Sequence, residues 1–265
     1  MKTLRLEEMT WLQIKNAMEQ GYRRVIFALG SIEQHGPHLP LVTDTLLGDA
    51  LATRVAAKLG NTLVAPTIRP GCSEHHLSFP GSLSISSNLL SAIARAYCEN
   101  LAHHGFQEIL LLPSHGGNFP TVARILPELA RDIPAKIIGY SDIYDFMRVM
   151  DAIAARYQMA SPEAGAHAGG TETSIVLAVR ADLVDRAHAQ PGFIGDFVAE
   201  SRKFQAGKAG FDMKMENFSP LGVLGDPTNA NVELGRDLLE GLADHLAAFY
   251  RAAMDETKDC PPERV

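Results

Sequence analysis

The feature that most constrains the fold is an alternation of short apolar segments with longer amphipathic ones. Four segments are apolar almost throughout and have the length of strands: 23–30, 62–66, 108–113 and 136–140. Segments with helical spacing precede, separate or follow them: 10–20, 45–60, 87–105 and one that begins after 118. Strands that are apolar throughout need cover on both faces, which the crossover helices of parallel strands provide. We therefore predict an α/β fold with three layers, α/β/α, around a mostly parallel central sheet.

The remainder of the chain is less regular. Residues 141–166 show no clear period, whereas 168–179 indicate a buried helix and 231–254 an amphipathic one. Residues 190–222 have weak periodicity and many glycines, and we interpret them as an excursion that covers the site or contacts another subunit. A chain of 265 residues fits one large α/β domain better than two small ones. We therefore predict a single domain over 1–265.

The composition argues against several classes of partner. A formal net charge of −7, a pI near 5.8 and the lack of a Lys/Arg block argue against nucleic-acid binding. No apolar run reaches the roughly 18 to 20 residues of a membrane span, and the N-terminus lacks the pattern of a secretory signal. Cys72, Cys98 and Cys260 stand far apart, which fits neither a disulfide framework nor a thiolate zinc site. We expect a soluble cytoplasmic protein that acts on a small molecule.

The first polar cluster follows the strand 23–30 directly, in 30-GSIEQHGPHLPLVTD-44. Residues two apart in an extended segment point to the same side, so Glu33 and His35 can present an oxygen and a nitrogen together. The glycine and prolines that follow keep the chain out of regular structure and let it fold back, which brings Asp44 to this pair. The alternative is a polar loop in which Asp44 caps the next helix.

Two further clusters offer similar side chains. The segment 113-PSHGGN-118 places His115 at the carboxyl end of a strand, where ligands of parallel sheets bind, although it could be only a glycine-rich turn. The segment 167-HAGGTETS-174 offers His167 and Glu172. A glutamate buried before an apolar helix is costly unless it is paired or bound to a cation. The alternative is an exposed Glu172 in the first turn, where the helix dipole favours an acid.

Together the clusters supply oxygen and nitrogen ligands without thiolate, a set typical of hydrolytic zinc or manganese sites. If Asp44 bridges two ions, each ion receives three ligands: Glu33, Asp44 and His115 on one, and His35, Asp44 and Glu172 on the other. A bridging hydroxide would complete both shells and balance the charge. Such a pair of ions lowers the pKa of the shared water and polarises a carbonyl. We predict two divalent ions per chain, zinc first, with manganese or iron as alternatives.

These motifs, together with 76-HLSFPGSLS-84 and 225-GDPTNA-230, resemble those of the creatininase (creatinine amidohydrolase) family. The motifs stand in the family's order and spacing from about residue 5 to 250. The resemblance implies a single α/β domain with a binuclear metal site at the strand ends, hydrolysis of a small amide C–N bond, and commonly a hexamer. Carried over by position, it implies the same five ligands and adds His167 as the residue that transfers a proton.

This chain departs from creatininase itself at two places. Creatininase has a tyrosine and a metal-binding glutamate after the histidine of the second motif, where this chain has Gly116 and Gly117. Creatininase also has a tryptophan four residues before the catalytic histidine, where this chain has Glu163. We therefore expect a substrate other than creatinine: a bulkier cyclic amide, a formamide or another small amide. A non-catalytic metal-binding or assembly protein on the same scaffold is the alternative.

Substrate contacts are expected from residues near these motifs. The candidates are Ser73, Glu74, Gly116, Gly117 and Glu163. Of the neighbouring His75 and His76 at most one can join the site, because adjacent residues in an extended loop point apart.

Overall fold

Four strands form one parallel sheet in the computed structural model, which describes residues 2–196, 199 and 214–256. The strands are β1 (Arg24–Leu29), β2 (Thr62–Val64), β3 (Glu108–Pro113) and β4 (Lys136–Gly139). They lie in the order β2-β1-β3-β4, and all three neighbouring pairs are parallel. The apolar segments thus became the strands, and the mostly parallel sheet that they predict is confirmed.

Helices precede, connect and follow these strands. They are α1 (Trp11–Glu19), α2 (Thr43–Leu59), α3 (Ser87–His103), α4 (Phe119–Asp132), α5 (Ile143–Ala154), α6 (Ser161–Ala164), α7 (Gly170–Arg180) and α9 (Val232–Glu256). Short 3₁₀ helices occur at η1 (Leu6–Glu8), η2 (Glu74–His76), η3 (Gly116–Asn118), η4 (Ala155–Tyr157), η5 (Ala181–Leu183), η6 (Arg186–His188) and η7 (Met215–Asn217). The irregular segment 141–166 thus contains α5 and α6.

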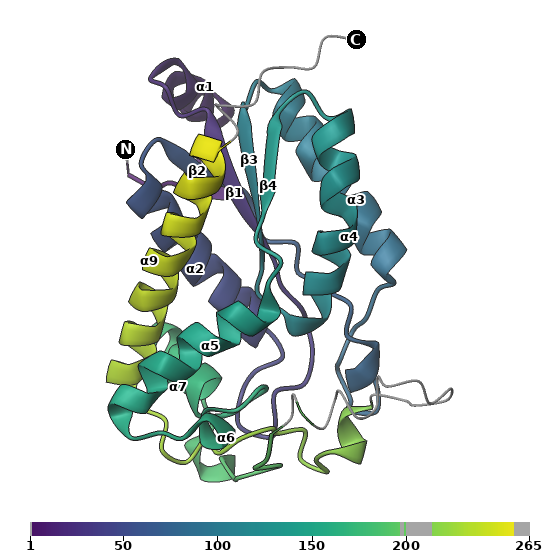
Figure 1. Cartoon of the computed structure of the whole chain (residues 1–265), viewed down its shortest axis with the longest axis vertical. Helices are drawn as coiled ribbons and strands as arrows, with labels where there is room; N and C mark the ends of the chain where they lie inside the picture. The colour runs from purple at the N-terminus through teal and green to yellow at the C-terminus, as the bar shows by residue number, and fades with distance from the viewer. Residues whose placement is uncertain (1, 197–198, 200–213, 257–265) are drawn as a thin grey trace.

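The side chains of each strand alternate between two apolar layers. Ile26 and Leu110 pack with residues of α2, α5, α7 and α9, whereas Phe27 and Leu111 pack with residues of α1, α3 and α4. Figure 1 shows these helices on opposite sides of the sheet, with α2 and α9 on one side and α3 and α4 on the other. This arrangement confirms the three-layer α/β/α fold.

The strand order brings the loops after β1 and β3 together. The chain moves from β1 outward to β2 and then returns to place β3 on the other side of β1. In parallel sheets, the crevice at such a reversal, outside the carboxyl ends of the strands, is where ligands bind. The first two polar clusters leave these two strands, so the topology directs both to this crevice.

Three further points concern membrane-spanning helices, the residues that the structure does not describe, and the cysteines. Within the described ranges, no helix combines the length and apolar character that a membrane crossing requires. Residues 197–198 and 200–213 of the predicted excursion, together with Cys260, lie outside the described residues. Cys72 and Cys98 are both free thiols.

Candidate metal centre

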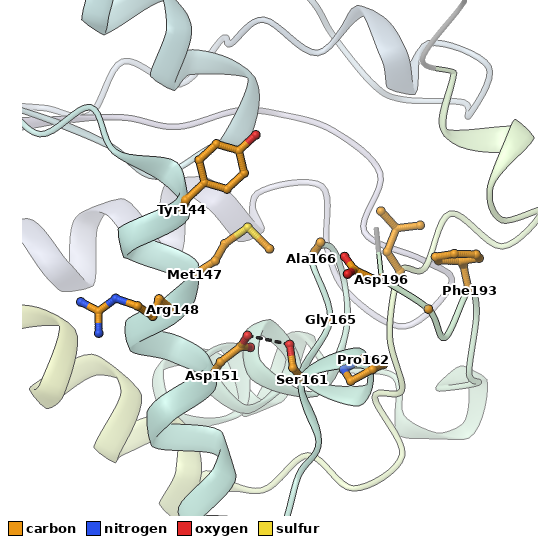
Figure 2. A pocket seen from close by; sticks show the side chains of 12 residues that line it. Tyr144, Met147, Arg148, Asp151, Ser161, Pro162, Gly165, Ala166, Phe193 and Asp196 are labelled. Carbon is orange, nitrogen blue, oxygen red and sulfur yellow. Dashed lines mark hydrogen bonds between the residues drawn. The ribbon is translucent and has the colours of Figure 1, made fainter. Parts of the chain in front are cut away.

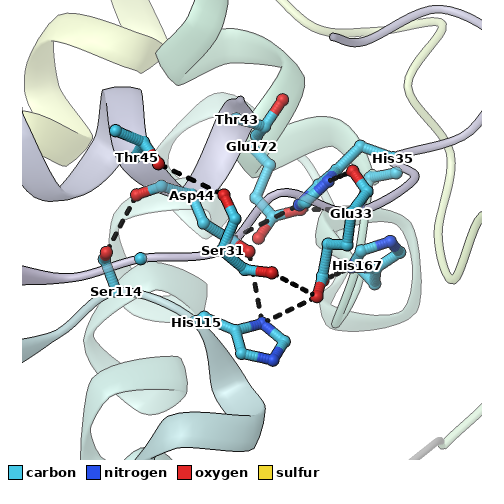
Figure 3. Close-up of polar contacts among 12 residues, drawn as sticks. Ser31, Glu33, His35, Thr43, Asp44, Thr45, Ser114, His115, His167 and Glu172 are labelled. Carbon is cyan, nitrogen blue, oxygen red and sulfur yellow. Dashed lines mark hydrogen bonds and ion pairs between the residues drawn. The ribbon is translucent and has the colours of Figure 1, made fainter. Parts of the chain in front are cut away.

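The three polar clusters converge at the carboxyl ends of β1 and β3 (Figure 3). Glu33 and His35 follow β1, and His115 follows β3. Asp44 lies in the first turn of α2, which begins at Thr43 rather than at residue 45. Glu172 lies in the first turn of α7. The five predicted ligands are therefore neighbours in space.

Their polar atoms form two groups that share Asp44. In the first half of the centre, His115 Nδ1 lies 3.2 Å from Glu33 Oε2 and 3.2 Å from Asp44 Oδ2. In the second half, His35 Nε2 lies 3.5 Å from Asp44 Oδ1 and 3.8 Å from Glu172 Oε2. Each Asp44 oxygen therefore faces a different histidine. The N-cap of α2 is Val42, so Asp44 does not cap this helix.

Several of these atoms lack the partner that burial demands. Among the described residues, Glu33 Oε1, His35 Nε2 and Asp44 Oδ2 are buried and make no hydrogen bond. Their contacts with charged groups lack hydrogen-bond geometry. Because buried polar atoms without partners are costly, a group of them that points at one spot fits a bound cation. Oxygen and nitrogen donors without thiolate suit zinc or manganese.

The pKa values show how strongly these charges interact. Burial alone would lower the pKa of His35, but Asp44 and Glu172 raise it to about 9. Burial likewise opposes the protonated form of His115, yet Glu33 and Asp44 raise its pKa well above the ordinary value. Burial raises the pKa of Glu172 to about 7. Unless a cation is bound, protons on the imidazoles balance the carboxylates.

Hydrogen bonds behind the first half hold its ligands in place. His115 Nε2 donates to the carbonyl oxygen of Cys72 over 3.1 Å, which leaves Nδ1 free to face the carboxylates. Ser31 Oγ donates to Glu33 Oε2 over 3.0 Å and lies 2.5 Å from Ser73 Oγ. Ser73 is fully buried and supports Ser31, and it does not line the cleft.

The two glycines after His115 have different structural roles. A Cβ atom on Gly117 would lie 2.3 Å from the Cys72 carbonyl oxygen and 2.6 Å from His115 Nε2. A side chain there would break the hydrogen bond that orients His115. A Cβ atom on Gly116 would meet nothing within 4 Å. Gly117 is therefore needed for the geometry of the site, whereas Gly116 leaves space in the cleft.

Two imidazoles lie between the side chain of Glu33 and residue Gln34. His76 Nε2 and His167 Nδ1 lie 3.2 and 3.7 Å from Glu33 Oε1. On the other side, the side-chain nitrogen Nε2 of Gln34 lies 2.7 Å from His76 Nδ1, and the backbone carbonyl oxygen of Gln34 lies 2.7 Å from His167 Nε2. Because a carbonyl only accepts, His167 carries its proton on Nε2 and presents an unprotonated Nδ1 to the centre. Burial and His35 lower the pKa of His167 to about 3, so its ring is neutral at neutral pH.

Sequence reasoning missed Gln34 and left the choice between His75 and His76 open. The alternation of side chains was the available signal for Gln34, since it places residue 34 on the side opposite Glu33. His76 makes the contact with Glu33, whereas His75 lines the cleft and stacks on His115 with 5.8 Å between ring centroids.

Glu74 and Glu163 do not line the cleft. Glu74 is exposed, and the Glu163 carboxylate accepts a hydrogen bond from the Ala160 N–H over 3.1 Å at the start of α6. Glu172 accepts a hydrogen bond from Ala168 N–H over 2.6 Å, and Ala168 has a φ of 53°. Left-handed backbone is unfavourable for alanine and is typical of functional sites, where the surrounding structure imposes it.

The centre opens into a cleft of about 360 Å³, within the usual range for small-molecule sites. Its walls combine the polar centre with apolar side chains from α5, η7 and the loops. They are Glu33, Asp44, His75, His76, His115, Gly116, Gly117, Pro120, Ile143, Tyr144, Met147, Ala166, His167, Glu172, Met215, Phe218 and Leu224.

Comparisons with known proteins identify the family. A sequence profile of the creatininase family, described as creatinine amidohydrolase, matches residues 7–250. The mycofactocin precursor peptide peptidase of Mycobacterium ulcerans is 32% identical over 228 residues, which are 83% of this chain and 81% of that protein. The creatinine amidohydrolase of Pseudomonas putida is 29% identical over 200 residues, 69% of this chain and 75% of that enzyme.

A solved structure shows the same fold. A mutant creatininase of the Zn–Zn type superposes with a TM-score of 0.75 and 24% sequence identity, covering 96% of this chain and 99% of that chain. With a family profile that spans nearly the whole described chain, and a polar centre at the sheet edge, this protein belongs to the creatininase family and is an amidohydrolase.

Proposed function

We propose that the chain is a binuclear metal-dependent amidohydrolase that cleaves the C–N bond of a small amide other than creatinine. The observation that carries this proposal is that Glu33, His35 and Asp44 offer ligand atoms within 4.8 Å of one another, and that each has a buried polar atom without a hydrogen bond. Glu33, Asp44 and His115 would hold one ion, and His35, Asp44 and Glu172 the other. When bound, the ions would supply an acidified water and a polarised carbonyl.

The residues of the chain would supply proton transfer and orientation. His167 is neutral and offers Nδ1 toward the centre, so it can take a proton from the attacking water and pass it to the departing nitrogen. Gln34 supports this role because its backbone carbonyl oxygen accepts the Nε2–H of His167, which leaves Nδ1 unprotonated. A nitrogen leaves poorly unless it is protonated as the C–N bond breaks, so this transfer would limit turnover on ordinary amides.

The substrate class follows from the open side of the cleft. Nothing lies within 4 Å of a Cβ on Gly116, where creatininase has a tyrosine, so we infer that amides bulkier than creatinine are accepted. The named relatives include enzymes acting on creatinine and on a precursor peptide, which supports a family site that is adapted to different amides. Lactams, formamides and short peptides are the compounds to screen.

The proposal also includes the identity of the metal ions, the cellular location and the oligomeric state. Zinc is our first choice of ion, with manganese or iron as alternatives. The solved neighbours include a Zn–Zn type and a manganese form, which supports either of these two metals. A cytoplasmic homo-oligomer, a hexamer by family resemblance, stays a prediction. We no longer propose substrate contacts from Ser73, Glu74 and Glu163, because none of them lines the cleft.

Metal analysis after gentle purification tests the core of this proposal. We expect about two ions per chain, and removal of the ions should abolish amide hydrolysis until zinc or manganese is restored. Less than about half an ion per chain would contradict the binuclear assignment. Ion-loaded protein that hydrolyses creatinine but no bulkier amide would contradict the assigned substrate class.

A further inference from the structure

A second cavity adjoins the metal cleft and has no part in the chemistry described above. This outer cavity has a volume of about 410 Å³ and lies between α5, the segment 161–166 and the segment 193–196 (Figure 2). It is as large as the metal cleft itself. A cavity of this size beside an active site can accommodate part of a substrate.

The same side chains border both cavities. The shared residues are Tyr144, Met147, Ala166 and Leu224. Figure 2 shows Met147 reaching from α5 toward Ala166. The two cavities are separated here by a flexible methionine side chain and a small alanine side chain, which an extended molecule can pass between. A ligand bound at the metal centre can therefore continue into the outer cavity.

The walls of the outer cavity indicate what it can bind. Apolar side chains contribute much of its lining: Met147, Pro162, Phe193 and Leu224. The charged groups at its edge already have partners in the chain. Asp151 accepts a hydrogen bond from Ser161 over 2.6 Å, and Asp196 accepts one from the Ala199 N–H over 2.8 Å.

The third charged group, Arg148, pairs with Asp145 and points away from the cavity in Figure 2. Burial raises the pKa of Asp151, which shows that its surroundings disfavour charge. An apolar group therefore suits the outer cavity better than an ion.

We propose that the outer cavity is a second substrate subsite, which binds an apolar arm of the amide whose C–N bond lies at the metal centre. This inference rests on the proposed function and makes its substrate class more specific. The preferred substrates are elongated amides with an alkyl or aryl arm, and compact rings such as creatinine leave this subsite empty.

Hydroxamates of increasing length can test the subsite without knowledge of the natural substrate, because their two oxygens bind a divalent ion. Acetohydroxamate probes the centre alone, and ω-phenylalkanohydroxamates extend a phenyl ring outward by stepwise longer chains. Calorimetric titration of the zinc-loaded protein gives each dissociation constant. We expect affinity to rise by about tenfold or more at the length that places the ring among Met147, Phe193 and Leu224, because burial of a ring there removes a large apolar area from water.

A matched pair of variants localises the gain. Ser161 lines the outer cavity but not the cleft. Ser161→Trp should fill the outer cavity and remove the length-dependent gain, while acetohydroxamate binds as before. Ser161→Ala loses the same hydrogen bond to Asp151 without adding bulk and should keep the gain. If Ser161→Trp does not fold, Phe193→Ala replaces it and should reduce only the affinity of the long hydroxamates.

The outcomes separate the two proposals. Acetohydroxamate that shows no zinc-dependent binding would overturn the metal centre and the subsite together. Acetohydroxamate that binds, with no gain at any length or with a gain that survives Ser161→Trp, would overturn the subsite alone.

Discussion

The two halves of the candidate metal centre differ in how closely their side chains approach one another. In the first half, Glu33 and His115 follow adjacent strands, Ser31 Oγ donates to Glu33 Oε2, and His115 Nε2 donates to the Cys72 carbonyl oxygen. In the second half, His35 Nδ1 donates to the Glu33 backbone carbonyl oxygen over 3.1 Å and Glu172 accepts from the Ala168 N–H, but the His35 Nε2 contacts of 3.5 and 3.8 Å are longer than the 3.2 Å contacts of His115.

The difference follows from where each half comes from in the fold. The sheet fixes the spacing between β1 and β3, so the first half is preorganised by backbone hydrogen bonds. The second half depends on Glu172, from a helix 128 residues beyond Asp44 in the chain, and its side chain is 15% exposed. We infer that the first half binds its ion more tightly and that the second exchanges its ion more readily.

The largest effect is expected from the residue that both halves share. Asp44→Ala should lose both ions and all activity, because two dications a few ångströms apart repel strongly without the bridging carboxylate. Glu33→Ala is the matched control and should weaken mainly the first half. Elemental analysis of both variants, with circular dichroism to verify folding, makes the measurement. Two tightly held ions in Asp44→Ala would show that Asp44 is not the bridge.

His167 lies beside both halves, and its replacement tests whether it is a ligand of either ion. His167→Ala should keep its ions and its fold, while turnover on ordinary amides falls by roughly 10²- to 10⁴-fold, the usual contribution of a general acid–base group. An amide whose leaving nitrogen is already a stable anion should be affected much less. Loss of an ion from this variant would make His167 a ligand and pass proton transfer to another residue, with His76 as the next candidate.

The two glycines offer a way to disturb the first half alone. Gly117→Ala should displace His115 from the Cys72 carbonyl and weaken the first ion by about 10- to 100-fold, as supporting contacts of metal ligands usually do. Gly116→Ala has open space around its Cβ and should change ion affinity and stability little. Chelator competition on the two variants gives the ratio of their dissociation constants for the first ion. Equal effects would mean that His115 does not depend on this hydrogen bond.

The affinity for the ions should also depend on pH, and more steeply in the second half. The raised pKa of His35, about 9, and that of Glu172, about 7, mean that an ion must displace protons from both ligands at pH below 7. Affinity for the second ion should therefore rise with pH, by up to about tenfold per unit for each proton displaced, and level off above about 9. Chelator titrations between pH 6 and 9 measure these slopes.

The stability of the ion-free protein should fall as the pH rises, whereas ion affinity increases with pH. A His35 pKa raised above its ordinary value stabilises the ion-free protein fully below pH 6.5, and this contribution is lost as the pH rises toward 9. The raised pKa of Glu172 acts in the same direction between about pH 4.5 and 7, since folding then opposes its ionisation. The Tm of ion-free protein should fall from pH 6.5 to 9. A Tm that rises over this range would contradict the charge balance described here.

The sequence by itself determined the sheet, its layers and the candidate ligands that meet at its edge. Runs that are apolar throughout, such as 108–113, must be buried on both faces, and this requirement alone predicts the parallel strands and their covering helices. The clusters at 33–44 and 115 follow because ligands gather where parallel strands end, whereas Glu172 follows because a buried glutamate needs a partner or a cation. Periodicity carries no such information for 141–166, so α5 and its contribution to both cavities were not predicted.

Only the tertiary structure decided which side chains in the loops reach the centre. It selected His76 rather than His75 for Glu33, placed Gln34 behind two imidazoles, and directed Glu74 and Glu163 away from the cleft. The physical reason is that the direction of a loop side chain depends on backbone angles set by distant contacts. Gln34, for example, lies 133 residues from the His167 that it orients, and no local pattern in the sequence encodes that separation.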